Sequence, residues 1–273
     1  MKLNKIICED AFEEIKKISD ESVNMILTDI PYGETGNDWD KDDIDLGLLM
    51  SQFGRIVKQD GCVAMTATMR LAVEIMKSVD LWRSANYKLN YKYEWVWEKD
   101  NGTNFLNSHY QPLKITEDIC VFGKLGCSWN RQGNMLYFPQ FEQGKAYTCV
   151  SGNQKKDSAV VRVGKGGREE VSGHITESDG KRYHKNIIRF NRDKEKLHPT
   201  QKPVALCEYL IKTYTNKGDL VWDNCIGSGT TAVACKQTGR DYIGFEMNPE
   251  YAKIAEERIK ATPKPLTAFT GAV

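Results

Sequence analysis

A carboxylate, a backbone carbonyl and an aromatic ring follow directly on an apolar run near the start of the sequence. The run is Val23–Leu27, and it leads into the segment TDIPYG at residues 28–33. It predicts a short buried strand that stops where proline interrupts the ladder. Ligands of open α/β sheets bind just beyond the carboxyl ends of strands, so Asp29, the Ile30 carbonyl and Tyr32 are expected at a binding site. An ordinary strand-to-loop turn is the alternative, because Asp and Pro are common there.

A second segment with chemical potential is DNCIGSGTT at residues 223–231, between a predicted strand and a predicted helix. Gly227 and Gly229 allow a tight turn and a close approach of backbone to ligand. Glu246 ends the next predicted strand, 17 residues beyond Gly229, near the spacing at which a carboxylate meets ribose hydroxyls. The segment lacks the Gly-Lys-Ser/Thr ending of a P-loop and one glycine of the dinucleotide fingerprint. It predicts an adenosine-containing cofactor without pyrophosphate, such as S-adenosylmethionine.

The elements that must position these residues alternate between strand and helix. In the first half, strands are expected at 5–8, 23–29, 62–66, 91–99 and 115–124, helices at 11–18, 44–57 and 70–81, a loop at 34–43, and turns at 58–61 and 100–102. In the second half, the pattern predicts helices at 204–214, 230–238 and 249–260 and strands at 220–223 and 241–246. Such alternation predicts an α/β fold with a doubly wound, mostly parallel, Rossmann-like sheet.

Between these halves, residues 126–196 have a different composition. From Ser151 to Lys196 there are twelve basic and seven acidic residues, a local excess of five positive charges. Tyr137, Phe138, Phe141, Tyr147, Tyr183 and Phe190 are interspersed along the stretch. Cations interleaved with aromatic rings suit a surface that grips phosphates and touches bases. A solvated, partly disordered insertion is the alternative, since charge-rich segments are often disordered.

The overall composition is that of an ordinary globular protein. Of 273 residues, 40% are hydrophobic and 27% charged, and the net charge of +1 gives no global field that attracts nucleic acid. No run approaches the ~20 apolar residues of a membrane span, and no signal peptide is expected, so a cytoplasmic protein without membrane contact is predicted. None of the eight cysteines forms a C-x-x-C pair, which favours buried thiols over a zinc site, and no metal is expected.

Four motifs in order make the chain resemble the β-class amino DNA methyltransferases, in particular the compact adenine-N6 enzymes of bacteria and their phages. They are the DIPY segment, the basic aromatic stretch, HPTQKP at residues 198–203 and the glycine segment. The resemblance covers roughly residues 5–260, and it departs from the family at Ile30, where a proline is usual, and at Asn224-Cys225, where Pro-Phe is usual. The resemblance implies a catalytic half at 1–125, an inserted DNA target-recognition region at 126–197 and a cofactor-binding half at 198–261. Residues 262–273 carry two prolines and little pattern, which predicts a flexible tail.

The resemblance also assigns residues to roles. It implies a catalytic motif made of Asp29, Ile30, Pro31 and Tyr32. The cofactor residues that it implies are Asp10 at the adenine, Glu246 at the ribose, Thr200 and Lys202 near the methionine carboxylate, and Asp223, Cys225, Gly227, Gly229 and Thr230 in the glycine loop. For the HPTQKP pair an alternative is open, in which Thr200 caps the following helix and Lys202 is solvated.

The implied reaction is direct displacement. Asp29 and the Ile30 carbonyl would accept the two N–H groups of the adenine amine, and Tyr32 would stack on a base that has left double-stranded DNA. The implied partners are double-stranded DNA, with a homodimer and a cognate restriction enzyme left open.

Rival functions are weaker. Cytosine-N4 methyltransferases share the fold and chemistry, but usually carry Ser where this chain has Asp29. Cytosine-C5 methylation would need a Pro-Cys nucleophile, which the sequence lacks. A protein-glutamine methyltransferase would be expected to carry Asn at position 29, and a nicotinamide oxidoreductase fits poorly with the residues from Asp29 to Tyr32. A catalytically silent DNA-binding module of the same fold is the alternative from another class.

Overall fold

A computed structural model describes residues 2–32, 44–81, 89–103, 105–124, 135–152 and 173–263. The predicted loop at 34–43 and the predicted tail from 264 on lie outside the described residues, as do five basic residues of the insertion between 153 and 172. The chain divides into two compact units. One combines Met1–Phe138 with Lys185–Val273, and the other is Pro139–His184.

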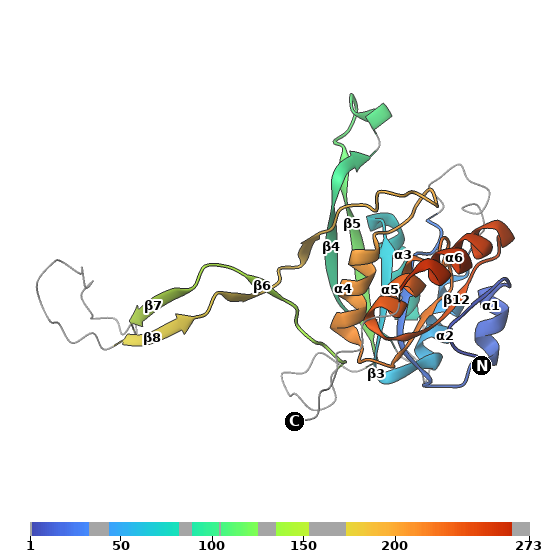
Figure 1. The fold of residues 1–273 in the computed structure, drawn as a ribbon, viewed down its shortest axis with the longest axis horizontal. Helices are drawn as coiled ribbons and strands as arrows, with labels where there is room; N and C mark the ends of the chain where they lie inside the picture. Colours follow the sequence, from blue (N-terminus) through green and yellow to red (C-terminus); the bar gives the residue numbers. More distant parts are fainter. Residues whose placement is uncertain are drawn as a thin grey trace, which may run out of the picture. The chain divides into compact units, whose positions relative to one another are not determined.

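The first unit is built on one eight-stranded sheet (Figure 1). Its strand order is β1 (Lys5–Ile7), β12 (Asp241–Phe245), β11 (Leu220–Asp223), β2 (Val23–Thr28), β3 (Val57–Ala67), β5 (Lys114–Gly123), β4 (Asn90–Thr103) and β10 (Ile187–Arg189). Neighbouring strands are parallel, except that β5 is antiparallel to both β3 and β4. The chain runs outward from β2 to β3 and in the other direction from β11 to β12. The strand order therefore reverses between β2 and β11, which is where sheets of this class bind ligands.

Helices cover both faces of the sheet. One set consists of α1 (Ala11–Glu14) with the 3₁₀ turn η1 (Ile15–Lys17), α2 (Leu46–Ile56) and α3 (Met69–Leu81), and the other of α4 (Val204–Tyr214), α5 (Thr230–Thr238) and α6 (Pro249–Ala261). Side chains of β2 alternate between the two cores: Ile26 packs in the core of the first set, and Met25 and Leu27 in that of the second. Among the described residues, no helix is long and apolar enough to cross a membrane.

Two predicted turns are wrong, because the strands continue through them. Residues 58–61 belong to β3, which shifts register against β2 between Val23 and Met25. Gly61 makes this bulge tolerable, since a Cβ there would lie 2.7 Å from the Asn24 carbonyl oxygen. Residues 100–102 belong to β4, whose pairing with β5 shifts after Glu98 and resumes at Thr103 opposite Lys114. The predicted helix at 11–18 is α-helical only to Glu14.

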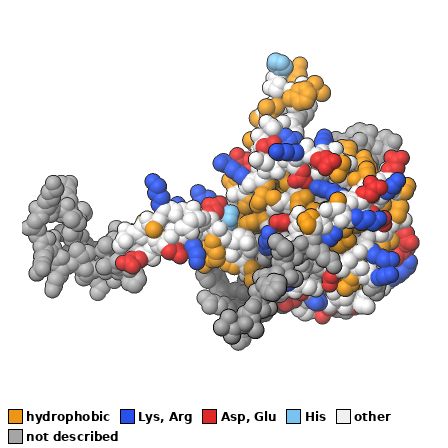
Figure 2. Space-filling view, viewed as in Figure 1, with side chains coloured by type: hydrophobic (Ala, Val, Ile, Leu, Met, Phe, Trp, Pro, Cys, Tyr) orange, Lys and Arg blue, Asp and Glu red, His pale blue; other side chains and the backbone are white. Residues whose placement is uncertain are grey.

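Because β4 and β5 continue so far, their hairpin projects beyond the sheet (Figure 1). A 3₁₀ turn, η3 (Phe105–Asn107), lies at its end. Figure 2 shows hydrophobic side chains gathered there, and Phe105, Leu106 and Tyr110 are 71%, 80% and 89% exposed. An exposed apolar cluster of this kind is typical of a contact surface.

The second unit consists of two small antiparallel ribbons. Strand β6 (Phe141–Gln143) pairs with β9 (Lys181–Tyr183), and β7 (Tyr147–Gly152) pairs with β8 (Gly173–Ser178). The rings of Phe141 and Tyr183 pack with their centroids 5.0 Å apart, and both are exposed. The unit is shorter than the predicted region 126–197, since β10 lies in the main sheet. Its role in DNA recognition stays a prediction.

Candidate active site

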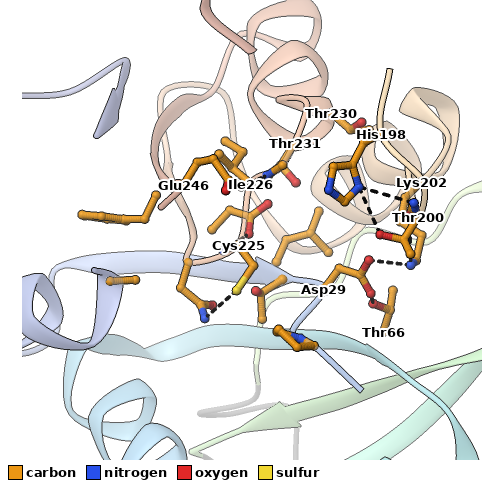
Figure 3. A pocket seen from close by; sticks show the side chains of 18 of the residues that line it. Asp29, Thr66, His198, Thr200, Lys202, Cys225, Ile226, Thr230, Thr231 and Glu246 are labelled. Atoms are coloured by element: carbon orange, nitrogen blue, oxygen red, sulfur yellow. Dashed lines mark hydrogen bonds and ion pairs between the residues drawn. The ribbon is translucent and has the colours of Figure 1, made fainter. Parts of the chain in front are cut away.

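A cavity of about 700 Å³ lies at the carboxyl ends of β2 and β11 (Figure 3). Ten of the predicted site residues line it: Asp10, Asp29, Pro31, Thr200, Lys202, Asp223, Cys225, Gly227, Thr230 and Glu246. Three others do not, namely Ile30, Tyr32 and Gly229. The size is that of a small-molecule site. The fold therefore brings together residues that lie as far apart in the sequence as Asp10 and Glu246.

The glycine loop after β11 forms one wall of the cavity. Asp223 ends the strand, and its Oδ1 accepts a hydrogen bond from the Cys225 amide at 3.0 Å. Gly227 and Gly229 have φ angles of 51° and 83°, which glycine adopts without strain. Gly229 also lies against α6, where a Cβ would come 2.8 Å from the Cβ of Ala255. The loop can turn sharply into α5 only because both positions are glycine.

Two further carboxylates approach this loop from neighbouring strands. Glu246 follows β12 and accepts hydrogen bonds from the amides of Gly227 at 3.0 Å and Asn248 at 2.9 Å. Burial raises the pKa of Glu246 above its usual range. Asp10 follows β1 and caps α1 by accepting from the Phe12 amide at 2.8 Å. Both acids line the cavity, as expected for contacts with a nucleoside, although their roles toward a cofactor stay predictions.

Asp223 is buried, and its burial raises its pKa from 3.8 to about 7. Asn224 beside it is also buried, and its Oδ1 has no hydrogen-bond partner among the described residues. A buried acceptor without a partner costs free energy unless a ligand or water satisfies it. An apolar cavity with two carboxylates, an unpaired amide oxygen and a glycine loop fits the nucleoside part of S-adenosylmethionine.

The other wall of the cavity, here named the catalytic wall, carries Asp29 and Pro31 of the predicted catalytic motif. Asp29 follows β2, and its Oδ1 accepts hydrogen bonds from the hydroxyls of Tyr32, at 2.7 Å, and Thr66. Its Oδ2 lies 2.6 Å from the Lys202 ammonium. Figure 3 shows Asp29 between Thr66 and Lys202. Ile30 is buried in the core that contains α2 and α3. Burial and the nearby Asp29 carboxylate raise the pKa of Tyr32 well above its usual range, so its hydroxyl stays a donor.

Lys202 also joins a buried charge network, which consists of Asp29, Lys202, Glu117 and Lys99. Glu117 of β5 lies 3.4 Å from the Lys202 ammonium and 2.6 Å from that of Lys99, on β4. The side chains of Lys202, Glu117 and Lys99 are only 11%, 14% and 6% exposed. Burial alone would lower the pKa of Lys202 and raise that of Glu117, but the opposite charges outweigh it in both cases. Lys202 and Glu117 are therefore both charged at neutral pH.

These contacts decide between the two interpretations of the HPTQKP segment. Helix α4 begins after Pro203 and has no side-chain cap, so the proposal that Thr200 caps it is wrong. The Thr200 hydroxyl instead lies 3.1 Å from Nδ1 of His198. Lys202 is buried, so the solvated alternative is wrong as well. Its predicted place near the methionine carboxylate stays a prediction beside its observed contact with Asp29.

His198 is half-buried, and its ring packs edge-on against Tyr251 at a centroid distance of 4.4 Å. Burial lowers the pKa of His198, which favours a neutral imidazole. Its Cδ2 is also one of the atoms closest to Gly227, 3.7 Å from where a Cβ would be. These packing contacts favour a structural role for the ring.

Sequence reasoning missed three residues near Asp29: Thr66, which lines the cavity, and Glu117 and Lys99, which contact Lys202 directly and through Glu117. Thr66 lies near the carboxyl end of a predicted buried strand, and this position alone could have marked it as a ligand contact. Glu117 and Lys99 gave no such signal, because each has charged neighbours along its strand, Asp118 beside Glu117 and Glu98 and Asp100 beside Lys99. Across the described residues, no group of three or more His, Cys, Asp and Glu side chains is placed to hold a metal ion.

A family model of N6/N4 methyltransferases, described as "DNA methylase", matches residues 23–257. The DNA adenine methyltransferase YhdJ of Escherichia coli (strain K12) is 27% identical over 264 residues, which cover 93% of this chain and 82% of that protein.

Two solved structures are similar as well. The M1.HpyAVI–SAM complex matches with a TM-score of 0.57 and 24% identity, covering 93% of this chain and 98% of that one. The cytosine-N4-specific PvuII DNA methyltransferase matches with a TM-score of 0.62 and 13% identity, covering 93% of this chain and 85% of that one. The predicted Rossmann-like methyltransferase fold is confirmed by these two structures together with the observed sheet.

Proposed function

Because the chain belongs to the DNA methylase family, we propose that it transfers a methyl group from S-adenosylmethionine to the N6 amino group of adenine in double-stranded DNA. The predicted family, and S-adenosylmethionine as that family's cofactor, are confirmed by the comparisons. The protein is a DNA methyltransferase of the N6/N4 type. The choice of adenine, the departure of the base from the duplex and the roles of individual residues are parts of the proposal.

The observation that carries the proposal is the position of Asp29. Its carboxylate lines the same cavity as the glycine loop and Glu246, so a bound cofactor and a target amine would meet beside it. The exocyclic amine of adenine is a poor nucleophile, because its lone pair is delocalised into the ring. An acceptor that holds its N–H favours a pyramidal nitrogen with a localised lone pair. Asp29 can be this acceptor, with the Ile30 carbonyl as the second.

When bound, S-adenosylmethionine would supply the methyl group. The amine would take it by displacement at the methyl carbon, and the sulfur would leave as a neutral thioether. The protein holds the base and the amine in line for this displacement. Tyr32 lies beside the Asp29 carboxylate, where its ring would stack on an extruded base. Cys225 is not a candidate nucleophile, since burial raises the pKa of its thiol well above the usual range.

Cytosine-N4 methylation is the second candidate. The similarity to the cytosine-N4-specific PvuII enzyme favours it, since the two chains share a fold over most of their length. The relative named as an adenine methyltransferase and the presence of Asp29, where cytosine-N4 enzymes usually carry Ser, favour adenine. The same cavity could hold either amine, because both bases present an exocyclic NH₂ group.

The test is methyl transfer from labelled S-adenosylmethionine to unmethylated double-stranded DNA, followed by nucleoside analysis. We expect the label in N6-methyladenine. Label in N4-methylcytosine would keep the family and mechanism but overturn the adenine assignment. Cofactor binding without any transfer to DNA would point to a silent DNA-binding module, and protein labelling would point to another substrate. A homodimer and a cognate restriction enzyme are separate proposals, tested by sedimentation and by cleavage of unmethylated DNA.

A further inference from the structure

Asp29 reaches the cavity with most of its hydrogen-bonding capacity already used. Two carboxylate oxygens offer about four acceptor positions. Among the described residues, three donors occupy them: the hydroxyls of Tyr32 and Thr66 at Oδ1 and the ammonium of Lys202 at Oδ2. One position is left for an incoming N–H group. The orientation of the carboxylate therefore depends on the group that fixes Oδ2, which is Lys202.

Lys202 is itself held from the other side. Its ammonium lies between two carboxylates, 2.6 Å from Asp29 and 3.4 Å from Glu117. Glu117 in turn is fixed by Lys99 at 2.6 Å. Lys202 itself lies in the segment before α4. The three groups that set the position of its ammonium come from other parts of the fold: Asp29 from the end of β2, Glu117 from β5 and, through Glu117, Lys99 from β4. Charges alternate along the network, and each inner charge has an opposite neighbour on both sides.

We infer that Glu117 is a positioning residue for methyl transfer, which acts through Lys202 to orient Asp29 and to keep negative charge at its carboxylate. Since Glu117 shares the Lys202 ammonium, Asp29 is not neutralised by a whole positive charge. Negative charge then stays available where positive charge develops on the attacking nitrogen. A buried cation with a single carboxylate would bind that carboxylate more tightly, and the carboxylate would then be a weaker acceptor for the N–H of the amine. The inference rests on the proposed function only for the role of Asp29.

The test removes the negative charge of Glu117 and keeps the shape of the side chain. In Glu117→Gln we expect kcat to fall roughly 10- to 100-fold, since a small misplacement of a reacting group can cost about 100-fold. The affinity for S-adenosylmethionine should change less than about twofold, because the glycine loop lies on the opposite wall. The matched control is Glu98→Gln, one residue before Lys99, where an exposed ion pair with Arg189 is lost and kcat should not change.

A pH profile separates positioning from a merely structural role. The groups that face Lys202 in the described structure are Asp29, Glu117, His198, the ring of Tyr32 at 5.6 Å and, through Glu117, Lys99. In Glu117→Gln one of the two carboxylates that raise the pKa of Lys202 is gone, while burial still lowers it. The alkaline limb of kcat should therefore move to lower pH, and Glu117→Asp should move it back toward the wild-type position.

The ammonium of Lys202 can also be titrated directly by nitrogen NMR of the lysine side chains, without any methyl transfer. A lower pKa of Lys202 in Glu117→Gln, together with the loss of kcat, supports the inference. Wild-type kcat and an unmoved alkaline limb in a folded Glu117→Gln protein overturn it. If that variant does not fold, as judged by cofactor binding, Glu117→Asp must show the smaller shift. Absence of transfer by the wild-type protein would contradict the proposed function instead, and the titration would still test the network.

Discussion

The cofactor wall of the cavity, which carries the glycine loop, Glu246 and Asp10, comes mostly from one continuous stretch of chain, whereas the catalytic wall around Asp29 is assembled from distant segments. Residues from Asp223 to Tyr251 supply the glycine loop, Glu246 and the start of α6. Asp29, Thr66, Glu117 and Lys202 come from four parts of the sequence that meet only in the folded sheet. The first wall is shaped by backbone conformation and backbone amides, and the second by side-chain contacts around one carboxylate. Substitutions in the first wall should thus affect folding and cofactor binding, and those in the second the rate of reaction.

The largest effect on the free energy of unfolding should come from Asp223, the buried acid of the cofactor wall. Burial raises the folded-state pKa of Asp223 to about 7, from 3.8 for an ordinary Asp. Between about pH 4 and pH 7 the folded protein holds a proton that the unfolded chain has released, so stability falls as pH rises through this window. The loss is on the order of 4 kcal/mol. Thermal unfolding of the wild type and of Asp223→Asn, followed from pH 4 to pH 8, should show this loss of stability only in the wild type. The same dependence of stability on pH in both proteins would contradict this prediction.

Gly229→Ala tests whether the glycine loop is built by backbone conformation. We expect a loss of about 3 kcal/mol in the free energy of unfolding, from a strained φ of 83° and from the contact with Ala255. The control is Gly218→Ala, where φ is 82° and a Cβ would meet nothing within 4 Å. This control should lose only about 1 kcal/mol. Equal losses in urea denaturation would show that the close approach of α6 does not matter.

Thr66→Val tests whether side-chain contacts to Asp29 on the catalytic wall set the rate of reaction. It removes a hydroxyl that donates to Asp29 while keeping the side-chain volume. We expect kcat to fall about tenfold, because a hydrogen bond to a charged group contributes roughly 1.5–3 kcal/mol. Affinity for S-adenosylmethionine should be unchanged. Thr213→Val, which removes an equally buried hydroxyl bonded to the Tyr209 carbonyl, should lower stability without lowering kcat. A larger effect on cofactor binding than on kcat would argue against separate walls.

The same difference explains what could be predicted from the sequence. Helices 204–214 and 230–238 and strand 220–223 begin and end where the pattern placed them, because apolar spacing and local signals agree there. The turn at 58–61 failed, because pairing with β2 overrides the local preference of Gln-Asp-Gly and a bulge absorbs the glycine. Local patterns were sufficient to predict the glycine loop and Glu246, since these residues are neighbours along the chain.

On the catalytic wall, Asp29 and Tyr32 could be predicted from their place after a strand as well as from the family resemblance, and Lys202 only from the resemblance. Glu117 and Lys202 are 85 positions apart, and no local pattern relates them. Their contact follows from the register of β5 in the sheet and from the path of the chain before α4. Lys202, placed near a cofactor by analogy, contacts the Asp29 carboxylate, which only the three-dimensional arrangement could reveal.

The most direct test of the account is to measure single-turnover methyl transfer and S-adenosylmethionine affinity on the same preparation of Asp29→Ala. We predict that transfer to DNA falls roughly 1,000-fold or more, since the variant loses the acceptor that activates the amine. The dissociation constant of the cofactor should stay within about threefold, because the glycine loop and Glu246 are untouched. Transfer at a near wild-type rate, or a parallel loss of cofactor binding, would contradict the division of the site into a catalytic wall and a cofactor wall.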